Sequence, residues 1–231
     1  MTARGGFAIY HGPSSVSAVF GPENAIPMSH EPGKTTDEEL VSRAQRGDED
    51  SFNELVRRWE RPIYALAYRT LGREEDARDV CQETFLRAYR ALRGFKGEAK
   101  FSSWLYRITL NLCRDWIRRQ RRTPVSQVPE GMELSDLAGE APDAVSVEDL
   151  VARREMSAAV SKVMAMLPEE QRTAIILKEY HGLTFQEIAD MLGCPLSTVK
   201  TRLYQGLTVL RRNLQRQNLQ VVAATRPALE T

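Results

Sequence analysis

The chain has 231 residues, of which 42% are hydrophobic and 27% charged, as is ordinary for a folded protein with room for two modest cores. Its longest aliphatic runs, residues 174–177 and 221–224, are far too short to span a bilayer, and no signal-like apolar segment develops near residue 1. We therefore expect a cytoplasmic protein without membrane insertion.

The net charge of +1 conceals a separation of charge along the chain. Residues 96–127 carry +6, residues 128–150 carry −7 without any basic residue, and residues 199–231 carry +5. Two basic segments around an acidic stretch that contains Pro and Gly are typical of two nucleic-acid-binding modules joined by a flexible linker.

Residues 1–36 are rich in Gly, Pro and Ser and lack periodicity, which predicts a disordered extension. Met28 within it is a candidate alternative start. From Asp37 onward every long segment has helical periodicity. We therefore expect an all-α protein of two small helical domains.

A first amphipathic helix is expected over residues 73–93. Its apolar face consists of Ala77, Cys81, Phe85, Ala88 and Leu92. The opposite face mixes acidic, basic and amide side chains. That mixture suits a protein contact, although an ordinary solvated surface explains it equally well.

The next helix is expected over residues 101–122 and carries two stripes. The apolar stripe consists of Leu105, Ile108, Leu112 and Trp116, and the polar one of Arg107, Asn111, Arg114, Arg118 and Arg122. Arginines neutralise phosphates and aromatic rings such as Phe95 and Phe101 stack on unpaired bases, so the pattern favours melted DNA. The alternative is that the aromatics form core and the arginines are only solvated; for Trp104 and Trp116 we favour core.

Residues 183–203, LTFQEIADMLGCPLSTVKTRL, are typical of a helix-turn-helix. Thr184 and Glu187 form a capping box, Gly193 suits the helix end, and Pro195 fits the first position of the second helix. The apolar stripe of that helix consists of Leu196, Val199, Leu203, Leu207, Leu210 and Leu214. Its other face is polar, which suits contacts with a DNA groove better than a plain helical hairpin.

Four stretches together resemble the extracytoplasmic-function group of bacterial sigma-70 factors. They are DVCQETFLRAYRAL (residues 79–92), FKGEAKFSSWLYRITLNLCRDWIRR (95–119), LPEEQR (167–172) and the helix-turn-helix. The resemblance implies a region 2-like domain over 37–122, an acidic linker over 123–150, a region 4-like domain over 151–214 and a tail over 215–231. His181, beside Gly182 at an expected helix end, is more simply a C-terminal dipole partner than a catalytic group.

The resemblance implies a transcription initiation factor that binds core RNA polymerase and recognises promoters, in the duplex minus-35 element and in the melted non-template strand of the minus-10 element. The implied contacts with the coiled coil of the largest core subunit are Asp79, Gln82, Glu83 and Arg87. Those with minus-10 DNA are Lys96, Lys100, Phe101, Asn111, Arg114 and Arg118. Those with minus-35 DNA are Ser197, Lys200, Thr201, Arg202, Tyr204 and Gln205. A second polymerase contact at the flap and an anti-sigma partner are also implied.

The second helix departs from the family after TRL, where an Arg-Ala-Arg pattern is common and this chain has Tyr204 to Leu207. Fewer cations predict weaker and less salt-sensitive minus-35 binding, and Gly206 is expected to cost about 0.5 to 1 kcal/mol of helix stability relative to Ala.

The acidic linker allows two interpretations. Its carboxylates Glu130, Glu133, Asp136 and Glu140 could mimic nucleic acid in the polymerase channel, or the segment could be a solvated tether.

Two other functions fit the sequence less well. A stand-alone helix-turn-helix regulator shares the DNA-binding motif, but we see no effector pocket or dimer helix. An enzyme is weaker still, because His11, His30 and His181 lie far apart and no catalytic motif, cofactor motif or metal-ligand spacing appears. The three cysteines are also far apart, as expected of reduced thiols.

Overall fold

The computed structural model describes residues 35–122 and 147–224, and every regular element within them is helical, as predicted. The first helical region contains α1 (Asp37–Gln45), α2 (Glu49–Leu71), α3 (Glu74–Ala91), the 3-10 turn η2 (Leu92–Gly94) and α4 (Phe101–Arg122). The second helical region contains α5 (Val147–Met166), α6 (Glu169–Ile175), the π-helical turn η4 (Ile176–Tyr180), α7 (Phe185–Leu192) and α8 (Leu196–Ala224).

The predicted N-terminal extension, the four linker carboxylates and residues 225–231 lie outside the described residues. Two predicted boundaries shift. Helix α5 begins at Val147, inside the segment predicted as linker, and α8 continues to Ala224, into the predicted tail. No helix in the described part of the chain is both long and apolar enough to cross a membrane.

The first helical region is built around α2, which packs against α1, α3 and α4. Local signals set its ends: the Asp48 side chain accepts a hydrogen bond from the Ser51 amide at 3.2 Å, and Gly72 closes the helix with a φ of 77°. The predicted apolar face of α3 is buried along its whole length, and Leu105 and Tyr106 of α4 are fully enclosed.

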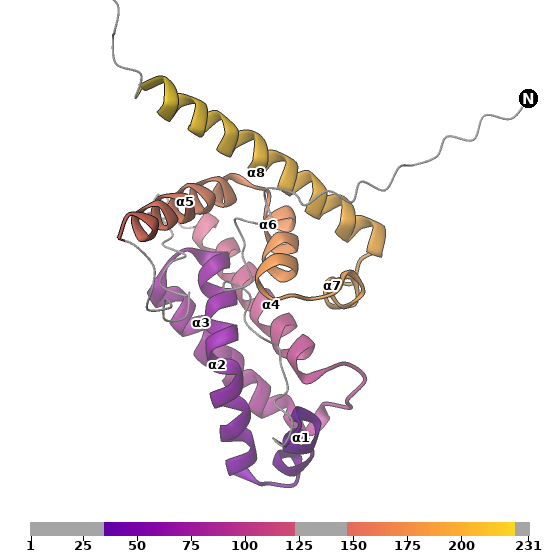
Figure 1. Ribbon diagram of the computed structural model, residues 1–231. Helices are drawn as coiled ribbons and strands as arrows, with labels where there is room; N and C mark the ends of the chain where they lie inside the picture. The colour runs from indigo at the N-terminus through magenta and orange to yellow at the C-terminus, as the bar shows by residue number, and fades with distance from the viewer. Residues whose placement is uncertain (1–34, 123–146, 225–231) are drawn as a thin grey trace, which may run out of the picture.

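In the second helical region, α8 lies across α6 and α7 (Figure 1). Val199, Leu203 and Leu210 of the predicted stripe are buried, and Leu196, Leu207 and Leu214 pack against the same core. The apolar stripe thus anchors the long helix through its first half.

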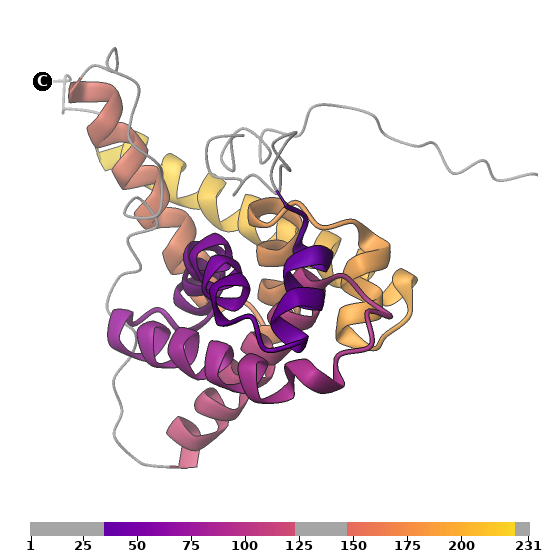
Figure 2. The same ribbon diagram turned by 90° about the horizontal axis from the view of Figure 1, so that it is seen from below.

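The two helical regions are packed on each other. One apolar cluster runs through both, α7 contacts α4, and η4 contacts α2. Seen from below, α1 lies in front of α4 (Figure 2). Two domains were predicted from the sequence, but this contact between them was not.

Packing between α8 and α6 explains why a glycine lies at position 206 despite its low helix propensity. It is buried where α8 crosses α6, and a Cβ at this position would lie 2.8 Å from Ile175 Cδ1 and 3.3 Å from Gln171 Cβ. The cost in helix stability expected from the sequence is therefore accompanied by a close approach of the two helices.

We expect Gly206→Ala to stabilise the protein more when Ile175 is shortened than when it is native. In an Ile175→Val background, which removes Cδ1, the alanine should raise the free energy of unfolding by about 0.5 to 1 kcal/mol. In the native background the gain should be smaller, because Ile175 must move aside. Urea unfolding of the four proteins measures both values, and equal gains in the two backgrounds would contradict the packing explanation.

Candidate functional site

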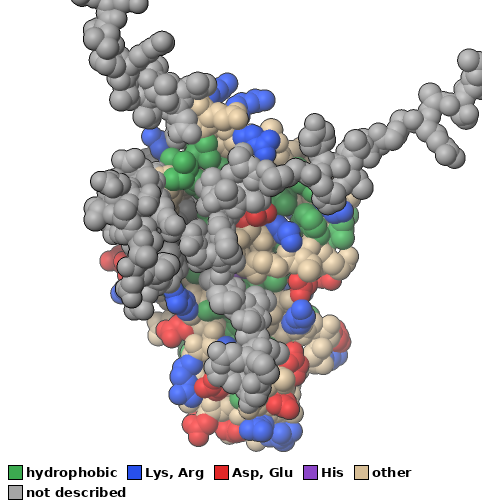
Figure 3. Space-filling model, in the orientation of Figure 1, with side chains coloured by type: hydrophobic (Ala, Val, Ile, Leu, Met, Phe, Trp, Pro, Cys, Tyr) green, Lys and Arg blue, Asp and Glu red, His purple; other side chains and the backbone are tan. Residues whose placement is uncertain are grey.

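The predicted polymerase-binding residues lie on the outer face of α3. Asp79, Gln82 and Arg87 are exposed, and Glu83 is half-buried. Arg87 Nε lies 2.7 Å from Glu83 Oε1, so these two side chains brace each other along the helix. The mixed charge of this face continues over the lower part of the molecule, where basic and acidic side chains intersperse (Figure 3).

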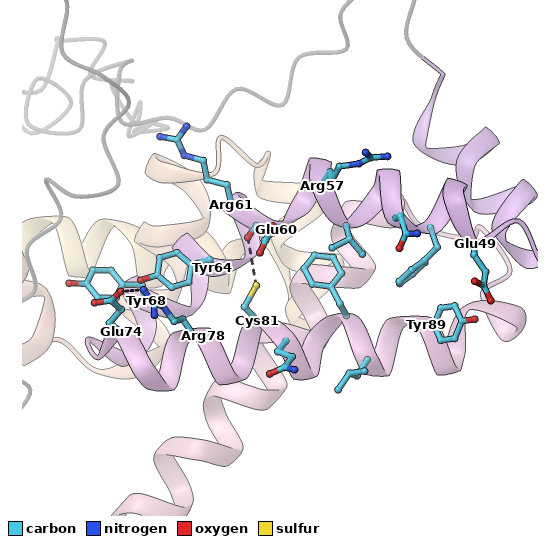
Figure 4. Close-up of a pocket in the computed structure, with 16 residues that line it drawn as sticks. Glu49, Arg57, Glu60, Arg61, Tyr64, Tyr68, Glu74, Arg78, Cys81 and Tyr89 are labelled. Carbon is cyan, nitrogen blue, oxygen red and sulfur yellow. Dashed lines mark hydrogen bonds and ion pairs between the residues drawn. The ribbon is translucent and has the colours of Figure 1, made fainter.

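A groove of about 1090 Å³ runs beside this face, between α2 and α3. Aromatic side chains from both helices point into it, and charged side chains stand along its edges (Figure 4). Gln82 is one of its lining residues. The large apolar side chains that remain exposed on its α3 side are Leu86 and Tyr89, at 44% and 51%. Such a groove fits the apolar stripe of a partner helix.

The sequence analysis missed this groove because its two walls come from different helices. Phe52 of α2 meets Tyr89 of α3 edge to face, with ring centroids 5.0 Å apart. Tyr64 and Tyr68 stack at the other end. The only available signal was that Leu86 and Tyr89 interrupt an otherwise polar face of the α3 segment.

The buried thiols of Cys81 and Cys113 have raised pKa values. Cys81 lines the groove with its Sγ 3.7 Å from the Glu60 carbonyl oxygen, and burial together with Glu60 raises its pKa to about 12. Burial also raises the pKa of the Cys113 thiol to about 12. Neither is expected to form an appreciable fraction of thiolate near neutral pH.

The predicted minus-10 residues divide into exposed and buried ones. Lys96, Lys100, Asn111, Arg114 and Arg118 are exposed.

Phe101 is only 2% exposed and lies against Phe95 and Trp104, with centroid distances of 6.2 and 5.8 Å. In this arrangement Phe101 supports the loop before α4, and its ring cannot stack on a DNA base without rearrangement. The α4 period places this first residue of the helix on the core side.

The polar stripe of α4 is engaged by the second helical region. Lys100 Nζ lies 2.7 Å from Glu187 Oε1, and Arg114 Nε lies 3.4 Å from Glu169 Oε1. Arg107, which the sequence placed in the stripe but not among the DNA contacts, donates to the carbonyl oxygens of Asp190 and Met191 at 2.5 and 3.1 Å. Three cations suited to DNA are therefore paired within the protein.

The helix-turn-helix has the predicted local geometry. Thr184 and Glu187 form both hydrogen bonds of the capping box, and Gly193 ends α7 with a φ of 63°. Helix α8 begins at Leu196, so Pro195 lies one residue before the position predicted for it. The carbonyl of Pro195 accepts hydrogen bonds from the first turn, including Thr198 N at 2.9 Å.

The predicted minus-35 residues lie on the outer face of α8, with one exception. Ser197, Lys200, Thr201, Tyr204 and Gln205 are exposed.

Arg202 is half-buried, and its Nη2 lies 2.8 Å from Glu170 Oε2 while its Nη1 lies 3.7 Å from Cys194 Sγ. These contacts brace α8 against α6 and the turn, so Arg202 has a structural task here. Gln171 Nε2 also donates to Gln205 Oε1 at 3.4 Å, which orients a second predicted contact.

His181 has a different environment from the one expected. It follows η4 at its C-terminal end, but its ring is fully buried and Nδ1 lies 3.2 Å from the Tyr106 hydroxyl. Burial, with a smaller effect of Arg69, lowers its pKa to about 3. A neutral ring cannot serve as a cationic dipole partner, so that expectation was wrong. No group of three or more acidic, His or Cys side chains among the described residues could hold a metal ion.

Two family models match the chain in order. The sigma-70 region 2 model matches residues 55–123, and the sigma-70 region 4 model matches residues 157–210. The RNA polymerase sigma-H factor of Pseudomonas aeruginosa is 38% identical over 181 residues, which are 78% of this chain and 94% of that protein. The ECF RNA polymerase sigma-E factor of Escherichia coli K12 is 35% identical over 182 residues, 78% of this chain and 95% of that one.

Two solved structures have a similar fold. CnrH in complex with the cytosolic domain of CnrY has a TM-score of 0.56 at 28% identity and covers 78% of this chain and 97% of that one. RpoE in complex with the anti-sigma factor NepR from Bartonella quintana has a TM-score of 0.57 at 21% identity and covers 71% of this chain and 96% of that one. At that identity the second likeness concerns the fold alone.

We expect Lys100→Met to raise the pKa of the Glu187 carboxyl. The Lys100 hydrogen bond is the main reason that this pKa is lowered from 4.5 to about 2. A lowered pKa contributes stability above pH 4.5 that is lost as the pH falls toward 2, so the wild type should lose more stability than the variant over this range. The difference should stay below about 1 kcal/mol because Lys100 is largely exposed.

Carboxyl NMR titration of Glu187 measures this shift directly. Lys96→Met, in the same loop, is the matched control and should leave the Glu187 pKa unchanged. An unchanged pKa in Lys100→Met would show that α4 and α7 do not meet in solution as described.

Proposed function

Because the chain belongs to the extracytoplasmic-function group of the sigma-70 family, we propose which of its surfaces carry the steps of transcription initiation. The protein is a transcription initiation factor that binds core RNA polymerase and directs it to promoters, and it is not an enzyme. The observation that carries this conclusion is the ordered match of regions 2 and 4, with relatives aligned over nearly their whole length. A stand-alone regulator is not favoured, since those relatives are polymerase factors.

The groove between α2 and α3 is proposed to receive the coiled coil of the largest core subunit. Exposed apolar side chains at the centre of an interface carry most of its binding energy, and polar rim residues set orientation. Leu86 and Tyr89 supply such anchors beside the groove. The rim on α3 consists of Asp79, Gln82, Glu83 and Arg87.

The loop before α4 and the exposed stripe of α4 are proposed to hold the melted minus-10 strand. Unstacking a base costs a few kcal/mol, which contacts with phosphates and captured bases must offset. The cationic and amide groups available on this surface are Lys96, Lys100, Asn111, Arg114 and Arg118. Phe101 supports the loop from inside rather than contacting DNA.

The start of α8 is proposed to enter the major groove of the minus-35 element. The proposed contacts are the exposed residues Ser197, Lys200, Thr201, Tyr204 and Gln205. Arg202 holds α8 in place through Glu170 and is assigned a supporting role. With few cations on this face, minus-35 binding should depend weakly on salt.

We also propose the partners and the compartment. A protein that acts on RNA polymerase works in the bacterial cytoplasm. The polymerase flap is a second contact for the helix-turn-helix region. An anti-sigma factor that covers both helical regions is proposed because the solved sigma factors with this fold were found with CnrY and with NepR.

In vitro transcription tests the proposed function. The full chain is mixed with core RNA polymerase on a promoter library, and RNA 5′ ends are sequenced against core alone. Discrete new start sites preceded by shared minus-35 and minus-10 elements are expected. Duplex binding by the free chain without any core-dependent initiation would favour the stand-alone regulator instead.

We expect Tyr89→Ala to weaken core polymerase binding by about tenfold, because truncating an exposed aromatic anchor typically costs about 1 to 2 kcal/mol. Fluorescence anisotropy of labelled protein titrated with core enzyme measures the dissociation constant. Met166→Ala, which removes an exposed apolar side chain at the end of α5 and outside the groove, is the control and should bind as the wild type does. Equal affinities for Tyr89→Ala and wild type would exclude the groove as the docking site.

A further inference from the structure

The two helical regions meet at a buried polar contact. Tyr106 of α4 lies against His181, with the hydroxyl 3.2 Å from Nδ1 and the ring centroids 5.0 Å apart. Beside them, Arg69 of α2 stacks over the Tyr180 ring with its guanidinium carbon 4.4 Å from the centroid. Four polar side chains from both regions are therefore enclosed in one interface.

The same closure occupies the cations of α4. Lys100, Arg107 and Arg114 bond to side chains or carbonyls of α6 and α7. If α4 holds the minus-10 strand, as proposed above, these contacts compete with DNA. In the closed arrangement, therefore, part of the minus-10 surface is already paired within the chain.

The separation of the two promoter elements is also incompatible with the closed form. Minus-10 and minus-35 elements are separated by about 25 base pairs, which at about 3.4 Å per step is about 85 Å of duplex. Helix α4 and the helix-turn-helix are in direct contact here. The two regions must therefore separate before both can reach their elements on one promoter.

Desolvation opposes closure. Arg69 Nε and Nη1 and His181 Nε2 are buried without a hydrogen-bond partner among the described residues. Burial lowers the pKa of Arg69 to about 10 and that of His181 to about 3. Buried polar atoms that lack partners are destabilising, and they regain water when the interface opens. Apolar packing stabilises the interface, and the desolvation of these polar groups lowers the free energy needed to open it.

We propose that the Tyr106–His181 contact is an intramolecular latch that holds the free chain closed over its minus-10 surface, and that protonation of His181 opens it. The titratable groups that face His181 are Arg69 from α2, Tyr106 from α4 and the adjacent Tyr180 of η4. A protonated ring would face the Arg69 cation inside an apolar surround. Only neutral histidine is compatible with closure.

The direction of the pH effect follows from proton binding. The open form exposes His181 with a pKa near 6.5, whereas the closed form holds it at about 3. The open form therefore binds more protons, and closure is fully stable above pH 6.5 and weakens as the pH falls below it. Between pH 7.5 and 5.5 the ratio of closed to open chains should fall about tenfold.

Single-molecule FRET on the full chain tests the latch without polymerase or DNA. Dyes are attached at Arg90→Cys and Arg211→Cys, both exposed, in a Cys194→Ser background, while the buried Cys81 and Cys113 stay unlabelled. We expect a mainly high-efficiency population at pH 7.5. At pH 5.5 the ratio of high-efficiency to low-efficiency molecules should be about tenfold lower. His181→Phe, which keeps a ring but cannot take up a proton, should lose that pH response.

Three further proteins make the test decisive. Tyr106→Phe removes only the hydroxyl and should lower the closed fraction at pH 7.5 while keeping the pH response. Glu179→Gln controls for the carboxyl of η4, because burial raises its pKa, and this variant should show the same pH response as the wild type. Glu187→Gln weakens the exposed ion pair with Lys100 and should lower the closed fraction. This variant tests closure independently if His181→Phe does not fold. Far-UV circular dichroism shows whether each variant is folded.

A low-efficiency wild type at pH 7.5, or an unchanged pH response in folded His181→Phe, would overturn the latch. The proposed function fails separately: a chain that closes as described but supports no core-dependent initiation keeps the latch and loses the assignment of α4 to promoter DNA. Normal initiation with a permanently open free chain would instead keep that assignment and exclude the latch.

Discussion

Helix α4 is shared between two sets of contacts, and the rest of the structure depends on that sharing. Its apolar side completes the core with α2 and α3, and its polar side lies under α7. Lys100, Arg107 and Arg114 are paired with the second region while Tyr106 packs against it. If α4 holds promoter DNA as proposed, these internal contacts compete with promoter contact, and the equilibrium between the two sets the fraction of chains that can bind a promoter.

The chemistry of the buried contact fits a reversible partition between these states. An interface made only of leucine and isoleucine would hold the regions together permanently. Here Arg69 and His181 lie in the same interface, and each loses hydration when it is covered. The surface ion pairs around it are exposed to solvent and contribute little each. Core polymerase, for which we propose a separate groove, need supply only a modest free energy to favour the open form.

Features encoded within one helix were predictable from the sequence, whereas those made by two helices were not. The apolar face of α3 and the Thr184–Glu187 capping box depend on residues three or four positions apart, and both were predicted correctly. The groove needs α2 and α3 together, and Tyr106 meets His181 across 75 positions. Arg202 looked like a DNA contact because its partner Glu170 lies on another helix. Phe101 was predicted to contact DNA because the apolar stripe was counted only from Leu105, although its spacing of four from that residue places it on the core side.

The placement of the thiols bears on which cellular signals this factor can register. With a pKa of about 12, only about one thiol in 10⁵ of Cys81 or Cys113 is ionised at pH 7. Peroxides and electrophiles attack the thiolate, so they have almost nothing to react with at either position. Cys81 lines the groove proposed to receive the polymerase, where an added oxygen or alkyl group would obstruct the proposed docking. The groove therefore stays chemically intact during oxidative attack, and information about oxidants cannot enter through these two side chains.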